Sequence, residues 1–165
     1  MQMEGQVVEK IEVRKISEGE ASEVFNGLLR EHSEFLRRFF KDAFQREFDR
    51  IVLPENERSY YIVSVNSTNE ALFGIGEISN QLKVWNISSM GRIIEKDKTE
   101  MRGWQYLKAI VDFATAQGVK VINATVNDAG EKAFKELETN GGLPKNCRIE
   151  WSICCNLKSV TLWIE

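Results

Sequence analysis

Residues 93–126 determine the predicted fold, and they read IIEKDKTEMRGWQYLKAIVDFATAQGVKVINATV. Within them, apolar residues recur at the spacing of one buried helix face, at Leu107, Ile110, Val111 and Ala114. Gly118 follows this run, where a residue with positive φ ends many helices. The stretch therefore predicts the end of a strand, a polar loop, a helix that runs to Gln117, and an apolar strand at 119–126.

The start of the predicted helix has features of an anion site. A strand–helix–strand unit of this kind makes a right-handed crossover and leaves its two strands parallel or splayed. The loop before the helix contains Gly103 and no proline. Because the first N–H groups of a helix are unpaired and its dipole is positive there, this loop can hold phosphate, and it also fits an ordinary capped helix start.

The rest of the chain supplies strands and helices on both sides of this unit. Further strands are predicted at 11–15, 59–65, 71–79, 82–94, 148–155 and 159–165. A turn is predicted at 66–70. Helices are predicted at 21–40, with a break near Ser33 and a second helix to Asp49, and at 128–140.

This order resembles the GCN5-related N-acetyltransferases, the GNAT superfamily, over nearly the whole chain. The family pattern Q/R-x-x-G-x-G/A matches residues 100–105, where Gly103 is kept and Glu100 and Gln105 replace the usual end residues. The resemblance implies a single α+β (α/β) domain over residues 1–165, with residues 1–5 a loose tail. Its sheet would be mixed and mostly antiparallel, with about seven strands, a splayed parallel pair and about four flanking helices.

The resemblance also implies acetyl-CoA as co-substrate. Pantetheine would pair with the backbone at the end of the first splayed strand, at Ile93, Ile94 and Glu95. Pyrophosphate would lie on the amides at the helix start, from Met101, Arg102, Gly103, Trp104 and Gln105. Asn127 could replace the family asparagine, whose position is occupied by Gly130.

Two residues are candidates for the base that an acceptor amine needs. Glu77 is the one carboxylate within its predicted strand, and it also fits a solvent-facing structural role. Ser88 lies in the middle of the next strand, where the family often places its base, and it could hold a water. Leu137 replaces the tyrosine that protonates the departing thiolate in many family members.

Three functions remain compatible with these residues. The first is acetyl transfer from acetyl-CoA to a small-molecule or peptide amine by direct attack. The second is a catalytically degenerate GNAT-like module that binds CoA or a partner in a regulatory role, which the changes at Glu100, Gln105, Gly130 and Leu137 favour. The third is an unrelated α+β domain without a CoA site.

Composition excludes other classes of function. The net charge of −3 gives no basis for nucleic-acid binding. No apolar run approaches a membrane span and no signal-peptide pattern opens the chain, so no membrane partner and a cytoplasmic location are expected. Three cysteines and one histidine make no zinc pattern, so no metal site is predicted.

Two further expectations concern surfaces. Five phenylalanines in the predicted helices fit either core packing or an apolar wall for an acceptor, and they are Phe35, Phe39, Phe40, Phe44 and Phe48. The open edge of a terminal strand could pair with a second copy, so a homodimer is possible.

Overall fold

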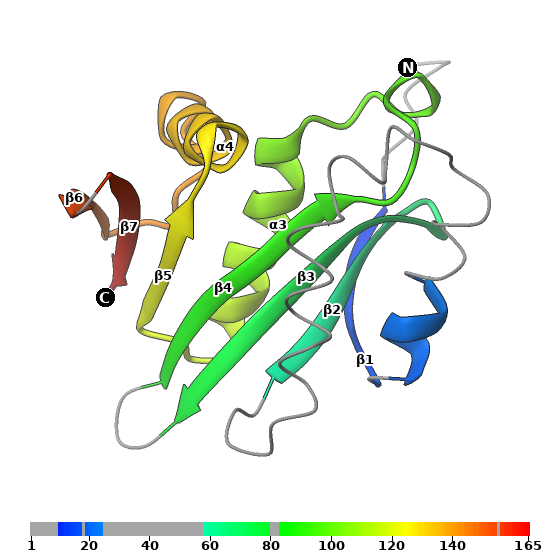
Figure 1. Cartoon of the computed structure of the whole chain (residues 1–165), viewed down its shortest axis with the longest axis horizontal. Coiled ribbons are helices and arrows are strands. Elements are labelled where there is room, and N and C mark those ends of the chain that lie inside the picture. Colours follow the sequence, from blue (N-terminus) through cyan, green and yellow to red (C-terminus); the bar gives the residue numbers. More distant parts are fainter. Residues whose placement is uncertain (1–9, 18, 25–57, 80–82, 155) are drawn as a thin grey trace, which may run out of the picture.

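A mixed sheet of seven strands forms the centre of the computed structural model, which describes residues 10–17, 19–24, 58–79, 83–154 and 156–165 (Figure 1). The strands are β1 (Ile11–Ile16), β2 (Arg58–Val65), β3 (Thr68–Ser79), β4 (Lys83–Arg92), β5 (Val121–Val126), β6 (Cys147–Cys154) and β7 (Leu157–Ile164). Their order is β1-β2-β3-β4-β5-β7-β6, and the β4–β5 pair alone is parallel among these neighbours. The predicted mixed, mostly antiparallel sheet is confirmed.

The parallel pair separates along its length. Pairing runs from Val84 opposite Val121 to Ile87 opposite Ala124, and both strands then continue without a shared register. Ser88 is an extra residue in β4, because Ile75 of β3 lies opposite Ile87 while Gly74 lies opposite Ser89. A bulge bends its strand and increases the local twist. The bulge at Ser88 therefore coincides with the point where β4 leaves β5, and the predicted splayed pair is present.

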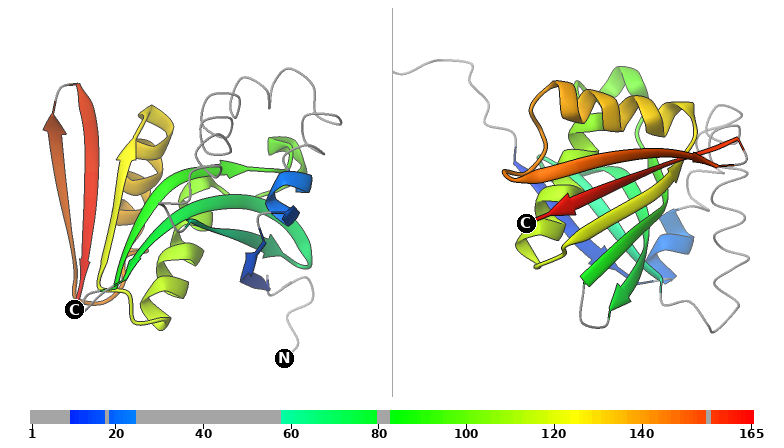
Figure 2. Two further views of the ribbon diagram at one scale, coloured as in Figure 1. Left: turned by 60° about the horizontal axis from the view of Figure 1, so that its bottom comes forward. Right: turned by 90° about the vertical axis from the view of Figure 1, so that its left-hand side faces the viewer.

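Two helices cover one face of the sheet (Figure 2). They are α3 (Gly103–Ala116) and α4 (Asp128–Thr139). The four residues predicted as the buried face of α3 are each 0% exposed, namely Leu107, Ile110, Val111 and Ala114. Residues 19–24 are also helical. Most of the predicted helical region 21–49, with its five phenylalanines, lies outside the described residues.

Glycine ends α3 as predicted. Gly118 has φ of +84°, and the Val119 N–H donates to the Ala114 carbonyl oxygen at 3.0 Å. The helix begins earlier than the apolar pattern indicates, because Gly103 is already its first residue. The Gln105 side chain explains this early start. Its Oε1 accepts a hydrogen bond from the Arg102 N–H at 2.7 Å and so caps the first turn.

The β2–β3 hairpin is tighter than the predicted turn at 66–70. Asn66 and Ser67 have φ of 51° and 69°, so a two-residue turn joins the strands. β3 therefore begins at Thr68, and Glu70 lies within a strand rather than in a turn.

The last strand is not at the edge of the sheet. β7 inserts between β5 and β6, so β6 has the open edge. The edge strands of the sheet are thus β1 and β6, and the homodimer stays a prediction. Within the described residues, no helix is both long and apolar enough to cross a membrane.

Candidate functional site

The separated ends of β4 and β5 lie at the same end of the molecule as the starts of α3 and α4 (Figure 1). α4 follows β5 directly, with Asn127 as its N-cap residue. A Cβ atom added to Gly103, the first residue of α3, would lie 4.0 Å from the Ala133 Cβ of α4. The fold thus packs the N-terminus of α3 against α4 beside the separated strands.

Two backbone amides at the start of α3 are available to a ligand. The N–H groups of Gly103 and Trp104 have no acceptor among the described residues, as expected for the first turn of a helix. Gly103 is exposed, so its amide is open to solvent. Unpaired amides at a helix start, together with the helix dipole, are features that favour anions, so the phosphate site at Gly103 and Trp104 stays a prediction.

The other three amides predicted for this site already have partners within the protein. The Met101 N–H donates to Thr99 Oγ1 at 3.1 Å, and the Arg102 N–H donates to Gln105 Oε1. The Gln105 N–H donates to the Arg102 carbonyl oxygen at 2.9 Å. Met101 is itself buried at 4% exposure. Gln105 therefore occupies an amide that a glycine or alanine in its place would leave for the ligand.

Side-chain charge adds little to this surface. The loop carries basic and acidic residues in equal number, namely Lys96, Lys98, Arg102, Glu95, Asp97 and Glu100. Lys96–Lys98 form a short 3-10 helix, and Lys98 pairs with Glu95 at 3.7 Å. Arg102 is exposed beside the free amides and is the cation best placed to reach a phosphate there. The backbone, more than the side chains, makes this end of α3 attractive to an anion.

The predicted pantetheine strand is displaced from its expected position. β4 ends at Arg92, so Ile93, Ile94 and Glu95 lie beyond the strand and their assignment to its end is wrong. The Ile93 N–H donates to the Glu70 carbonyl oxygen at 2.8 Å, one step beyond the Ala71–Arg92 pair, so it continues the contact between β3 and β4 past the end of β4. The separated part of β4 is instead the stretch 88–92, after the bulge.

The residues at the start of α4 have structural partners. Asn127 Oδ1 accepts from the Gly130 N–H at 2.9 Å and caps the helix. A Cβ atom at Gly130 would lie 3.2 Å from Met90 Cε of β4 and 3.1 Å from Val126 Cβ of β5. Met90 therefore reaches across the separated strands and packs where the family asparagine would stand.

Leu137, at the family tyrosine position, belongs to the core. It is 0% exposed, and its Cδ1 would lie 2.6 Å from a Cβ atom at Gly142. Leu137 therefore fills a core position and limits the space for a side chain at Gly142. Position 137 therefore provides no proton donor, and its side chain belongs to the core.

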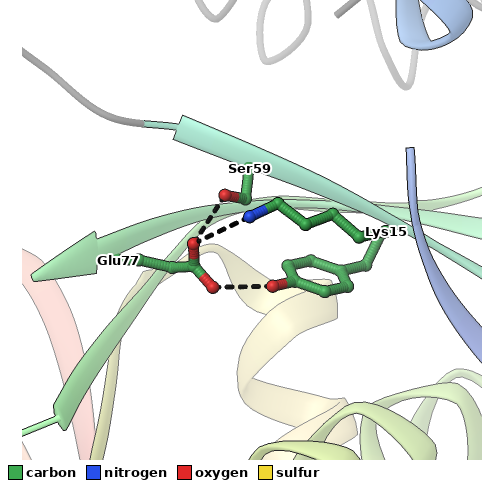
Figure 3. A network of polar contacts seen from close by, with 4 residues as sticks. Lys15, Ser59 and Glu77 are labelled. Carbon is green, nitrogen blue, oxygen red and sulfur yellow. Dashed lines mark hydrogen bonds and ion pairs between the residues drawn. The ribbon is translucent and has the colours of Figure 1, made fainter. Parts of the chain in front are cut away.

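Glu77 is the centre of a polar network that joins β1, β2 and β3 (Figure 3). Its carboxylate accepts from Tyr61 OH at 2.6 Å, Ser59 Oγ at 2.7 Å and Lys15 Nζ at 3.3 Å. Burial raises the pKa of Glu77, but the bonds from Tyr61 and Ser59 and the charge of Lys15 outweigh burial, so the pKa lies below its usual value. A lowered pKa makes this carboxylate a weak base for an amine.

Ser88 lies at the bulge where β4 and β5 separate, and its Oγ donates to the Gly74 carbonyl oxygen at 3.0 Å. This bond gives the side chain a structural role in the bulge. Glu77 pairs across the strands with Trp85, on the side of the bulge where β4 and β5 are still paired. The structure therefore does not bring the two candidate bases together, and their catalytic roles stay predictions.

Glu70 is a buried polar residue that the sequence pattern does not single out, because it falls in the predicted turn. It is 6% exposed, and its Oε1 accepts from Thr99 Oγ1 at 2.5 Å and Tyr106 OH at 2.6 Å. Burial and the bond to Glu70 raise the pKa of Tyr106 to about 12. The sequence signal that could have indicated a buried Glu70 is its position directly before the apolar run that begins at Ala71.

Comparison with known proteins identifies this arrangement. No protein-family model matches the chain, and no curated protein matches it. Solved structures do match. The N-acetyltransferase PseH of Campylobacter jejuni, in complex with acetyl coenzyme A, has a TM-score of 0.54 and 13% identity over 94% of this chain and 100% of its own.

Aminoglycoside acetyltransferases are similar to the chain as well. The enzyme AAC(6')-Ib, in complex with coenzyme A and kanamycin, has a TM-score of 0.59 and 13% identity over 93% of each chain. The aminoglycoside N(6')acetyltransferase of Legionella pneumophila has a TM-score of 0.59 and 11% identity over 96% of this chain and 94% of its own. At these identities the similarity is one of fold.

Proposed function

Because the chain has the fold of the GCN5-related N-acetyltransferases, we propose that it is an acyl-CoA-dependent N-acetyltransferase with acetyl-CoA as co-substrate. The observation that carries the proposal is the coincidence of three features at one end of the sheet. β4 and β5 separate after Ile87 and Ala124, α3 begins with free amides, and α4 begins beside it. Solved structures of this fold include complexes with acetyl coenzyme A and with coenzyme A.

Some of the residues at the start of α3 fit the pyrophosphate of acetyl-CoA. The amides of Gly103 and Trp104 would donate to it, and Arg102 would add charge. Gly103 has no side chain between its amide and the ligand. The separated backbone of β4, at 88–92, would pair with pantetheine in place of the missing β5 partner. The remaining predicted amides, at Met101, Arg102 and Gln105, already have partners within the protein and are not part of this cradle.

Transfer would proceed by attack of a neutral amine on the thioester carbonyl carbon. A C–N bond forms, the C–S bond breaks, and the amine proton passes to water while the thiolate leaves. A thioester is already activated, so positioning of the two reactants supplies much of the acceleration. The chain contributes this positioning, and we assign no acid or base to it.

The acceptor in this proposal is a small-molecule or peptide amine. AAC(6')-Ib is complexed with kanamycin in one neighbour and with parmomycin in another. An aminoglycoside is therefore a reasonable first acceptor to test, together with polyamines and peptides that have a free N-terminal amine. The net charge of −3 weakly favours cationic acceptors.

Calorimetry with acetyl-CoA tests the proposal, with thiol release followed in parallel against an amine panel. We expect binding and amine-dependent release of CoA. Failure of acetyl-CoA to bind at millimolar concentration would overturn the proposal, and the similarity would then extend to fold alone.

A second function, a regulatory CoA-binding module, is favoured by a specific observation. Leu137 is a core residue with no proton to donate where the family has a tyrosine, and the Gln105 side chain occupies the Arg102 amide, one of those expected to bind the ligand. Tight CoA binding without release of thiol in the presence of any amine would support this module and exclude the transferase.

A further inference from the structure

Glu70 connects three parts of the chain that meet below the start of α3. It lies in β3, and its Oε1 accepts hydrogen bonds from Thr99 in the loop and Tyr106 in the helix, at 2.5 and 2.6 Å. Burial and this bond raise the pKa of Tyr106 to about 12. The phenol therefore keeps its proton, and donates to Glu70, throughout the neutral range.

The same residue holds the loop between β4 and α3 at both of its ends. The Glu70 carbonyl oxygen accepts from the Ile93 N–H at 2.8 Å, where the loop begins. Near the other end, Thr99 Oγ1 accepts from the Met101 N–H at 3.1 Å while it donates to Glu70. Backbone and side chain of one residue thus fix the two ends of a polar loop.

Arg92 supports this arrangement from the end of β4. Its Nη2 donates to the Met101 carbonyl oxygen at 3.2 Å, and its guanidinium lies over the Tyr106 ring, 5.8 Å from the centroid. The main chain of Met101 is therefore bound through both its N–H and its carbonyl. Met101 stands two residues before Gly103, so its position sets the direction of the free amides that follow.

We propose that Glu70, Thr99 and Tyr106, here called the Glu70 anchor, are positioning residues for the diphosphate of acetyl-CoA. The inference rests on the proposed function. The anchor holds the loop so that the Gly103 and Trp104 amides already point toward the anion before binding. A flexible loop would have to be ordered when the ligand binds, which lowers affinity. A buried carboxylate is costly unless it is hydrogen-bonded, and its two hydroxyl donors meet that requirement here.

Two substitutions weaken the anchor and keep the side-chain shape. Tyr106→Phe removes one donor to Glu70, and Thr99→Val removes the other donor together with the acceptor of the Met101 N–H. In the full-length protein, each is expected to raise the Kd for CoA and the KM for acetyl-CoA about tenfold, because a less ordered loop binds the diphosphate less well. The kcat is expected to change less than about twofold, because neither hydroxyl touches the reacting atoms. Thr99→Ser keeps the hydroxyl and is expected to restore wild-type KM.

Thr115→Val is the matched control. The Thr115 hydroxyl donates to the Val111 carbonyl oxygen at 2.8 Å in the last turn of α3, far along the helix from Gly103. If the anchor had a structural role alone, the two variants would melt at a lower temperature than wild type and keep its KM and Kd. That result would overturn the inference. Wild-type protein that does not bind acetyl-CoA would overturn the proposed function, and the inference with it. Binding by wild type with unchanged Kd in both variants would overturn the inference alone.

Discussion

A negative charge introduced at Gly103 should change the stability of the protein and its affinity for CoA in opposite directions. A carboxylate at the first position of a helix stabilises it through the dipole. The same carboxylate would repel a diphosphate from the free amides. Because a Cβ atom at Gly103 meets nothing nearer than Ala133 at 4.0 Å, we expect Gly103→Asp to keep the fold and to abolish CoA binding, as measured by calorimetry and circular dichroism.

Gly103→Asn and Gly103→Ala separate charge from size in this test. Asparagine has the shape of aspartate without its charge, and alanine adds the Cβ atom alone. We expect CoA affinity to decrease in the order Ala, Asn, Asp. Equal affinity in Gly103→Asp and wild type would show that the diphosphate does not lie at the start of α3.

Gln105 provides a second test at the residue scale. Its side chain accepts from the Arg102 N–H, an amide that a phosphate could otherwise use. Gln105→Ala is expected to tighten CoA binding about threefold or more, because hydrogen bonds to charged groups are the stronger kind. It should also lower helix stability by about 0.5–1 kcal/mol, because a cap is lost.

Gln105→Glu is the control for this change, because it keeps the cap and adds negative charge. Calorimetry should show weaker CoA binding for Gln105→Glu than for wild type. If Gln105→Ala binds CoA less tightly than wild type, the side chain contributes to the site rather than competing with the ligand.

At the scale of elements, the contact between Met90 and Gly130 joins β4 to α4 where the sheet has separated. A side chain at position 130 would press on Met90 Cε at 3.2 Å and Val126 Cβ at 3.1 Å. Gly130→Asn, which introduces the family residue, should therefore lower the free energy of unfolding by about 1–3 kcal/mol. Denaturant unfolding measures this change.

A double-mutant cycle checks the assignment. Met90→Ala together with Gly130→Asn should be more stable than the sum of the single changes predicts, with a coupling of about 0.5–3 kcal/mol. The relief should be partial because Val126 remains. Strict additivity would mean that Met90 does not limit the space at Gly130.

The Glu77 network joins β1, β2 and β3, and it should make stability depend on pH. The pKa of Glu77 is lower in the folded chain than its usual value, so its contribution is present above the unfolded pKa of about 4.3 and is lost as the pH falls through the folded pKa. Glu77→Gln should cost about 1–2 kcal/mol at pH 7. The gap between variant and wild type should narrow below about pH 4.3.

Glu150→Gln is the control for the Glu77 test, because Glu150 forms an exposed pair with Arg148 at 3.3 Å. Such pairs contribute about 0–1 kcal/mol. A Glu77→Gln variant with unchanged stability at pH 7 would contradict the role of Glu77 as a structural centre.

The sequence predicts elements better than it predicts partners. The buried face of α3 and the glycine at its end follow from spacing and backbone conformation, which are local properties. Glu70 could not be assigned, because its burial depends on a hairpin turn three residues shorter than the predicted turn and on hydroxyls that are distant in sequence. The amides at Met101 and Arg102 were predicted for a ligand, since the sequence cannot show that Thr99 and Gln105 already bind them.

At the scale of the whole molecule, a ligand that binds the folded state and not the unfolded state must raise the unfolding temperature of the protein. Acetyl-CoA at a hundredfold excess over its Kd would add about 2.7 kcal/mol. For a chain of this length, that stabilisation corresponds to about 5–10 °C. Thermal unfolding followed by circular dichroism should show this shift for wild type.

The dependence of this shift on the start of α3 is the decisive part of the prediction. In Gly103→Asp the shift should vanish, although the protein without ligand should unfold at or slightly above the wild-type temperature because of the helix dipole. In Gln105→Ala the shift should grow, although the protein without ligand unfolds earlier. Opposite changes in intrinsic stability and in ligand response cannot come from a general loosening of the fold. An equal shift in all three proteins would place the CoA diphosphate away from the start of α3.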